Sequence, residues 1–246
     1  MLVGRAAEQE RLRLLLTAAR AGKSSSIILR GEPGIGKSAL CEYAVEQSAG
    51  MAVLRTRGIE AESELAFSGL AELFCAVLEH LEQIPPPQAA ALAGALAIGP
   101  TVGGDRLTIC AATLSLLAAV AEDGPVLAVV DDSQWVDRSS LEAVLFAARR
   151  LDSEGVAVVF ALREGRPTLF DRSELTEIHL LGLDDDAAAE LLERHARVQV
   201  APEIAARILA AAAGNPLALI EIPAHLTDDQ LRDQDEIGRA SCRERV

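Results

Sequence analysis

The chain has 246 residues, of which 50% are hydrophobic and only 3% are aromatic, and its formal net charge at pH 7 is −14. This length suits one α/β domain followed by a small second domain, with a core packed from Ala, Leu, Val and Ile. The acidic balance argues against nucleic-acid binding by bulk electrostatics, because phosphate contacts need clustered Lys and Arg.

Three further features predict a cytoplasmic chain that binds no membrane. The N-terminus passes quickly into a charged helical pattern, without the apolar core of a signal peptide. The longest weakly polar stretch, residues 109–121, is too short to span a bilayer. Cys41, Cys75 and Cys110 have spacings that fit no metal site, which indicates buried, reduced thiols.

The first predicted helix follows the short segment Val3-Gly4-Arg5. Its apolar residues repeat at i, i+3, i+4 and i+7, which predicts one buried helical face. They are Leu12, Leu15, Leu16 and Ala19. Gly22 can end this helix, and the apolar run at 26–29 then predicts a buried strand.

Residues 31–38 read Gly-Glu-Pro-Gly-Ile-Gly-Lys-Ser and match G-x-x-x-x-G-K-S/T at every fixed position. A predicted strand precedes this loop and a predicted helix at 39–48 follows it, which is the context of a phosphate-binding loop. Glycines let backbone N–H groups approach phosphate oxygens, and a helix N-terminus adds partial positive charge. The alternative is a glycine-rich turn that only leads into a helix.

In a phosphate loop, Lys37 would reach the β- and γ-phosphates of a nucleotide, and the Ser38 hydroxyl would ligate Mg²⁺. The candidate nucleotide-binding residues of this stretch are Gly31, Pro33, Gly34, Ile35, Gly36, Lys37, Ser38 and Ala39.

The next segment predicts a strand at 51–56 and then a helix, because apolar residues from Phe67 to Leu81 share one helical face. The prolines at 85–87 are expected to break helical structure. Short helices are then expected at 88–97 and 107–118.

The run Val126-Leu127-Ala128-Val129-Val130 predicts a strand buried on both faces of a parallel sheet. Asp131 and Asp132 follow at its carboxyl end, where ligands of such sheets bind. This is the Walker B pattern: Asp131 would hold Mg²⁺, and Asp132 would polarise the attacking water. The alternative is a pair of helix-capping aspartates.

Ser133-Gln134-Trp135-Val136-Asp137 continues the pattern as Asp-Asp-x-x-Trp-x-Asp, and cap-like residues at 139–142 open another helix. That helix reaches Arg149-Arg150, where an arginine finger or an exposed helix end would fit.

A buried strand is predicted at 156–162. Arg163 follows it, either as a γ-phosphate contact or in a salt bridge to one of the aspartates.

After a last strand at 176–181 the pattern is helical only. Helices are predicted at 187–196 and 202–213, and a third begins near Pro216. Gly214 can stop the second helix and Pro216 can start the third. These helix-ending and helix-starting roles would still allow Pro216 to contact a ligand.

Taken in order, Val3-Gly4-Arg5, the loop at 31–38, Asp131-Asp132 with Trp135, Arg163 and Gly214-Asn215-Pro216 resemble the ATPase module of STAND-class AAA+ proteins. The LuxR-type ATP-binding transcriptional regulators are the most similar branch. The resemblance implies a three-layer α/β P-loop NTPase core at 1–182 with a parallel sheet, followed by a partial α-helical lid at 183–235.

The resemblance also implies roles outside the phosphate loop. Val3, Gly4 and Arg5 would lie near the adenine, although Ala6 stands where the family has Glu. Arg163 would sense the γ-phosphate, and Pro216 would pack against the adenine. The implied ligands are ATP or ADP with Mg²⁺.

The function implied by the resemblance is a slowly hydrolysing signal-transduction switch, with self-association that depends on the nucleotide. DNA would be bound only through a missing C-terminal domain. The same module also accompanies cyclase and kinase domains, which is one alternative. A stand-alone ATPase or nucleoside kinase is another, and the acidic surface disfavours a replication-type loader.

The last residues, 236–246, differ from the rest of the chain and resemble a translated sequencing adapter. A genuine basic tail is the alternative. We therefore expect the natural sequence to be visible only to about residue 235, with its continuation cut away.

Overall fold

The computed structural model describes residues 2–100, 105–165 and 168–232. The predicted adapter-derived tail at 236–246 lies outside the described residues. The chain forms two compact units. The α/β unit comprises Ala7–Gly31 and Lys37–His179, and the helical unit comprises the residues up to Ala6, Glu32–Gly36 and the residues from Leu180 onward.

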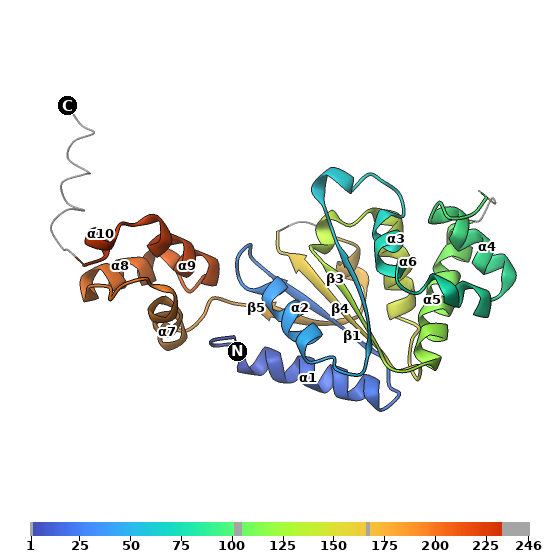
Figure 1. The fold of residues 1–246 in the computed structure, drawn as a ribbon, viewed down its shortest axis with the longest axis horizontal. Coiled ribbons are helices and arrows are strands. Elements are labelled where there is room, and N and C mark those ends of the chain that lie inside the picture. The colour runs from blue at the N-terminus through green and yellow to red at the C-terminus, as the bar shows by residue number, and fades with distance from the viewer. Residues whose placement is uncertain (1, 101–104, 166–167, 233–246) are drawn as a thin grey trace. The chain divides into compact units, whose positions relative to one another are not determined.

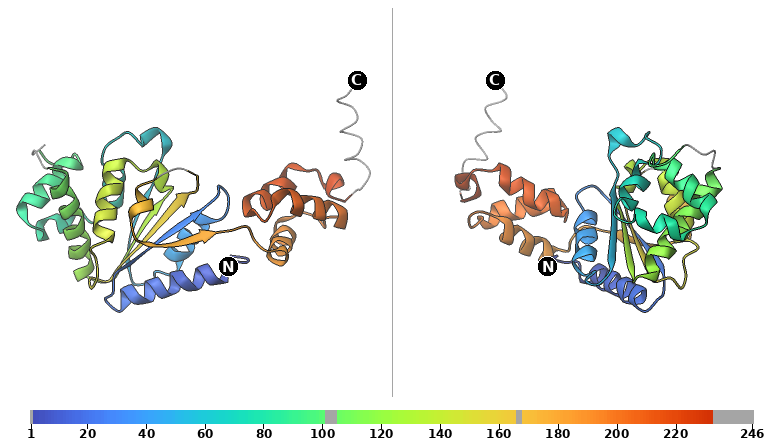
Figure 2. Two further views of the ribbon diagram at one scale, coloured as in Figure 1. Left: turned by 180° about the vertical axis from the view of Figure 1, so that it is seen from behind. Right: turned by 45° about the vertical axis from the view of Figure 1, so that its right-hand side comes forward.

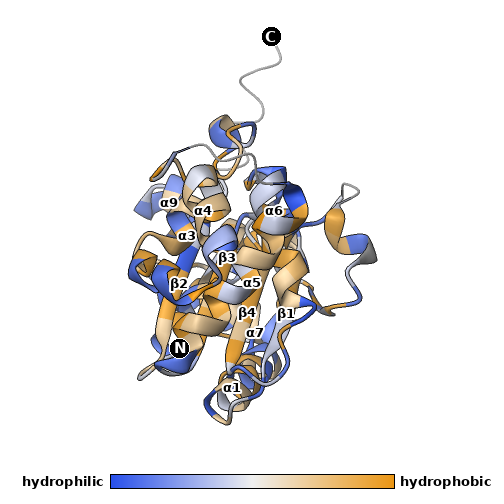
Figure 3. Cartoon of the chain, turned by 90° about the vertical axis from the view of Figure 1, so that its right-hand side faces the viewer, coloured by the Kyte–Doolittle hydropathy of each residue, from blue (hydrophilic) through white to orange (hydrophobic). Residues whose placement is uncertain are grey.

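Among the described residues, one five-stranded sheet has the order β2-β3-β4-β1-β5. The strands are β1 (Ser25–Gly31), β2 (Ala52–Arg57), β3 (Val126–Asp131), β4 (Val156–Arg163) and β5 (Thr176–Leu180). The pairs β2–β3, β3–β4 and β1–β4 are parallel. The predicted α/β fold with a parallel sheet is confirmed. β4 is buried along nearly its whole length, and its residues carry the hydrophobic colour in Figure 3.

Helices cover both faces of the sheet (Figures 1 and 2). α1 (Ala6–Arg20) and α2 (Lys37–Glu46) lie on one face, and α3 (Ser68–Phe74), α5 (Arg106–Glu122) and α6 (Arg138–Ala148) lie on the other. α4 (Pro86–Ala95) packs against α5. Even-numbered residues of β3 and β4 join the core beneath α3 to α6, as the side-chain alternation of strands requires.

One helix prediction in the region between β2 and α5 was wrong. The apolar face from Phe67 to Leu81 is not one helix, because α3 ends at Phe74 and a separate 3₁₀ helix spans Leu78–Gln83. The helix predicted at 88–97 is present as α4, but it already begins at Pro86. Prolines are tolerated there because the N–H groups of a helix's first turn have no partner within the helix.

The helical unit contains α7 (Asp185–His195), α8 (Pro202–Ala212), α9 (Pro216–His225) and α10 (Asp228–Arg232). It has a core of its own, built from Leu183, Ala187, Ala188, Leu191, Leu192, Ile204, Ile208, Ala212, Leu219 and Leu231. None of the helices in the described part of the chain has the length and apolar character that a membrane crossing requires.

The cysteines differ in exposure, and the prediction that all are buried was wrong for Cys75, which is exposed after the end of α3. Cys41 is buried in α2, and burial raises the pKa of its thiol. In the folded chain we expect iodoacetamide to modify Cys75 at least about tenfold faster than Cys41, because only an accessible thiolate reacts. Peptide mass mapping measures both rates, and in urea the difference should vanish. Equal rates in the folded chain would contradict the assigned burial.

Candidate nucleotide-binding site

The ends of four strands meet at the carboxyl edge of the sheet in the α/β unit. Gly31 at the end of β1 pairs in register with Arg163 at the end of β4. Arg57 at the end of β2 pairs in register with Asp131 at the end of β3. Parallel strands present all their carboxyl ends at the same edge, so residues far apart in the sequence gather there.

Lys37 is the first residue of α2 and is only 8% exposed. Its Nζ donates a hydrogen bond to the carbonyl oxygen of Gly31 at 2.9 Å. Burial lowers the pKa of Lys37; the charge of Asp132 opposes this shift, while that of Arg163 adds to it. The structure therefore brings the predicted Lys37, Asp131, Asp132 and Arg163 within electrostatic range of one another.

Asp132 leaves the strand geometry directly after β3. Its backbone is left-handed, with φ 47° and ψ 43°, and its N–H donates to Oδ1 of Asp131 at 2.8 Å. Its Oδ2 accepts from both Nε and Nη2 of Arg57, each at 3.1 Å. Arg57 was missed by the sequence analysis. The sequence feature that could have indicated Arg57 is its position at the end of β2, because the neighbouring strand β3 ends in the aspartates.

Arg163 is exposed, and its guanidinium forms no hydrogen bond or ion pair with any other described residue. Of the described cations, Arg57 is the one that forms the ion pair with Asp132. The alternative interpretation of Arg163, a salt bridge to one of the aspartates, is not found among the described residues. The backbone N–H of Arg163 donates to Oε1 of Gln134 at 3.0 Å. A γ-phosphate contact by the Arg163 side chain stays a prediction.

Asp137 joins the N-termini of α3 and α6. Its carboxylate is 2% exposed and accepts hydrogen bonds from the backbone N–H groups of Phe67 at 2.8 Å, Gly69 at 3.1 Å and Ser140 at 2.9 Å. Asp137 is therefore the N-cap of α6, rather than the serines at 139–140 that the sequence suggested. Its side chain fixes the turn that follows Asp132.

Close packing at the end of β2 needs a glycine. A Cβ on Gly58 would lie 2.3 Å from the carbonyl oxygen of Asp132 and 2.6 Å from the N of Val136. Trp135 lies half-buried beside it and lines a cavity of about 210 Å³. Trp135 therefore packs beside the turn that follows Asp132, which is the role expected for it from packing alone.

In the helical unit, Arg5 is 6% exposed and is bonded to two backbone segments. Its Nη2 donates to the carbonyl oxygens of Ile35 at 2.9 Å and Leu181 at 2.7 Å. Gly4 has φ 65°, and a Cβ there would lie 2.6 Å from the Cβ of Ala187. Both residues thus have a packing role, and an adenine contact by Val3, Gly4 and Arg5 stays a prediction.

The loop segment Glu32–Gly36 is bonded to the start of α9. Asn215 Nδ2 donates to the carbonyl oxygen of Pro33 at 2.9 Å, and the N–H of Leu217 donates to that of Gly34 at 3.2 Å. A Cβ on Gly34 would lie 2.7 Å from the Cβ of Leu217. The contact between the loop glycine and the helix therefore depends on the absence of a side chain.

Asn215 is a second residue that the site prediction missed. Its Oδ1 accepts from the N–H groups of Leu217 and Ala218, so it is the N-cap of α9, and Pro216 occupies the first turn. An Asn before a Pro is a sequence signal for such a cap. Gly214 has φ 74° and follows the end of α8. The helix-stop and helix-start interpretations are therefore observed, whereas contact of Pro216 with adenine stays a prediction.

The metal prediction rests on Ser38 and Asp131. In the described part of the chain, no group of three or more His, Cys, Asp or Glu side chains could hold a metal. Mg²⁺ at nucleotide sites needs no such group, because it takes one or two protein oxygens and completes its shell with phosphate oxygens and water. The exposed Ser38 in the first turn of α2 and the half-buried Asp131 at the end of β3 fit that donor set.

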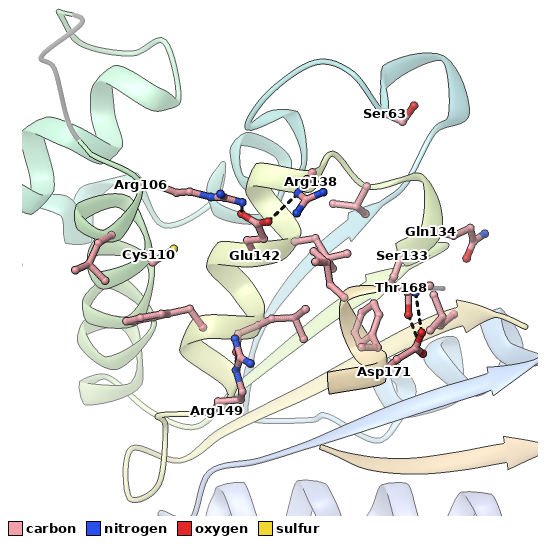
Figure 4. Close-up of a pocket in the computed structure, with 18 residues that line it drawn as sticks. Ser63, Arg106, Cys110, Ser133, Gln134, Arg138, Glu142, Arg149, Thr168 and Asp171 are labelled. Atoms are coloured by element: carbon pink, nitrogen blue, oxygen red, sulfur yellow. Dashed lines mark hydrogen bonds and ion pairs between the residues drawn. The ribbon is translucent and has the colours of Figure 1, made fainter. Parts of the chain in front are cut away.

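A separate open groove of about 1260 Å³ lies between α5, α6 and the segment 168–171 (Figure 4). Arg106 and Arg138 both pair with Glu142 on its wall. None of the predicted nucleotide-binding residues lines it. The groove reaches the segment that follows the two aspartates at Ser133, Gln134 and Val136.

A parallel sheet with a glycine-rich loop and lysine after β1 and two aspartates after β3 defines the class of P-loop nucleotide triphosphatases. Residues 1–160 match the model of the AAA ATPase domain family. The chain belongs to this family. A search of curated proteins finds no match to the sequence.

Solved structures share the fold at low sequence identity. A Walker-type ATPase of Pyrococcus abyssi has a TM-score of 0.60 and 15% identity, over 98% of this chain and 71% of its own. A STAND protein with a tetratricopeptide repeat sensor from Pyrococcus horikoshii has a TM-score of 0.52 and 16% identity, over 94% of this chain and 31% of its own. Drosophila ORC bound to DNA has a TM-score of 0.58 and 14% identity, over 90% and 54%.

Proposed function

We propose that this chain is the ATP-binding switch module of a larger cytoplasmic signal-transduction protein, most similar to the LuxR-type transcriptional regulators. Residues 1–182 would bind and slowly hydrolyse ATP, and 183–235 would form the lid. The chain spans less than a third of the STAND protein named above, which carries a sensor beyond its ATPase module. DNA would be bound only by a domain outside this sequence.

One observation carries the proposal. The loop segment Glu32–Gly36 is hydrogen-bonded to the start of α9 through Pro33 and Gly34. A nucleotide phosphate that binds the N–H groups of this loop would act on the same backbone that holds α9. A ligand moves a conformational equilibrium only through its difference in affinity for the two states. A shift from 1:99 to 99:1 needs about 5.5 kcal/mol.

In this proposal each site residue has a separate role in ATP binding or hydrolysis. Gly31, Lys37, Ser38 and the N–H groups of the loop bind the phosphates. Mg²⁺, held by Ser38 and Asp131, would neutralise phosphate charge. Asp132 polarises the water that attacks the γ-phosphate, and Arg163 contacts that phosphate and so distinguishes ATP from ADP. Hydrolysis then resets the switch. Nucleotide-dependent self-association is part of the same proposal.

Lys37→Ala tests the proposal. In the wild-type chain, Mg·ATP at 100 times its Kd should raise the free energy of unfolding by about 2.7 kcal/mol. Loss of the ammonium that meets the β- and γ-phosphates should abolish this increase. Urea titrations with and without Mg·ATP measure it.

Lys23→Ala is the matched control, because Lys23 is exposed in the turn before β1 and the chain has no other lysine. Its ATP-dependent increase should equal that of the wild type. An increase that persists in Lys37→Ala would show that the assigned site is wrong. Fast steady-state turnover by the wild type would instead favour a stand-alone ATPase.

A further inference from the structure

Gln134 has both ends of its side-chain amide bonded to predicted site residues. Its Nε2 donates to Oδ1 of Asp132 at 3.0 Å, and its Oε1 accepts from the backbone N–H of Arg163 at 3.0 Å. Gln134 is half-buried in the 3₁₀ turn that follows Asp132, and its place beside Ser133 is labelled in Figure 4. One amide therefore links the end of β3 to the end of β4.

The Asp132 carboxylate is oriented by two side chains. Arg57 holds Oδ2, but the Arg57 side chain is 68% exposed, and exposed ion pairs contribute little because solvent screens them and both side chains lose entropy. Gln134 holds Oδ1 from a half-buried position. Since Asp132 leaves the strand with a left-handed backbone, no ladder of strand hydrogen bonds fixes its direction.

We propose that Gln134 is a positioning residue for ATP hydrolysis, which sets the direction of the Asp132 carboxylate and ties it to the backbone of Arg163. This inference rests on the proposed function. Asp132 would act on the attacking water, and Arg163 on the γ-phosphate. A displacement of the Arg163 backbone on phosphate contact passes to Asp132 through the single amide of Gln134.

Gln134→Glu separates the two ends of this bridge. The introduced carboxylate has nearly the shape of the amide and still accepts from the N–H of Arg163. It cannot donate to Asp132, however, and places a like charge against Oδ1. We expect kcat for ATP hydrolysis to fall about 10- to 100-fold, as for other residues that orient a reacting group. The Kd for Mg·ATP should change less than about twofold, because the Gln134 amide bonds to Asp132 and to the backbone, not the guanidinium, of Arg163.

Gln134→Ala removes both ends of the bridge. Its kcat should fall at least as far as that of Gln134→Glu, again with the Kd for Mg·ATP nearly unchanged. A residue with a purely structural role would instead change binding and hydrolysis together.

Gln83→Glu, an exposed change of the same kind at the end of the 3₁₀ helix before α4, is the control and should match the wild type. Wild-type kcat in Gln134→Glu would overturn the proposal. So would a parallel loss of ATP binding, kcat and thermal stability, because that describes a structural residue. If the wild-type chain itself binds no Mg·ATP, the proposed function fails first, and this inference fails with it.

Discussion

The variant Asp137→Ala should lose about 3–6 kcal/mol of unfolding free energy, a large fraction of the stability of an ordinary domain. The carboxylate accepts from the N–H groups of Phe67, Gly69 and Ser140, and the substitution removes all three acceptor contacts at once. A buried N–H group without a partner costs about 1–3 kcal/mol. The site is 2% exposed, so water cannot replace the lost oxygens without opening the turn.

Urea unfolding followed by circular dichroism measures this loss. Asp105→Ala is the matched control, because Asp105 caps α5 with a single backbone bond, to the N–H of Thr108, and is exposed. The unfolding free energy of Asp105→Ala should decrease clearly less, since water can replace the lost carboxylate oxygen. Equal decreases in the two variants would mean that Asp137 acts only as an ordinary helix cap.

Asp132→Asn should abolish ATP hydrolysis while ATP binding persists. Removal of a general base slows a reaction about 10²- to 10⁴-fold, and the amide cannot take a proton from the attacking water. The shape of the side chain is kept, so Gln134 and the loop at 31–38 should stay in place. Single-turnover hydrolysis and calorimetric binding of Mg·ATP measure the two effects separately.

Asp152→Asn makes the same chemical change on an exposed residue before β4, at the opposite edge of the sheet, and should hydrolyse ATP like the wild type. An equal loss of binding and hydrolysis in Asp132→Asn would mean that Asp132 is structural, with its ion pair to Arg57 as its main role.

The strands were predictable because each is a short apolar run with a clear boundary. Val126–Asp131 and Val156–Arg163 are buried on both faces, so their residues need no alternation and stand out from the amphipathic helices. The helix at Ser68–Phe74 was predicted too long. Periodicity does not show where a chain changes from an α-helix to a 3₁₀ turn, because both bury every third or fourth residue.

The supporting residues of the candidate site were not predictable in the same way. Arg57 contacts Asp132 only because β2 and β3 are neighbours in register, although the two residues are 75 positions apart. Asn215 reaches Pro33 over 182 positions. A single sequence carries no record of such pairs, because hydrogen bonds between distant residues depend on strand order and packing.

The sequence by itself determined the residues with chemistry of their own: the glycine loop with Lys37 and Ser38, the aspartates after an apolar strand, and the α/β class. These signals are local, since a phosphate-binding motif is recognised from residue types at a fixed spacing along the chain. Only the tertiary structure decided which side chains hold them. The register of β2 on β3 placed Arg57 on Asp132, and the pairing of β3 with β4 brought the backbone of Arg163 to Gln134. The packing of α3 against α6 made Asp137 a buried acceptor.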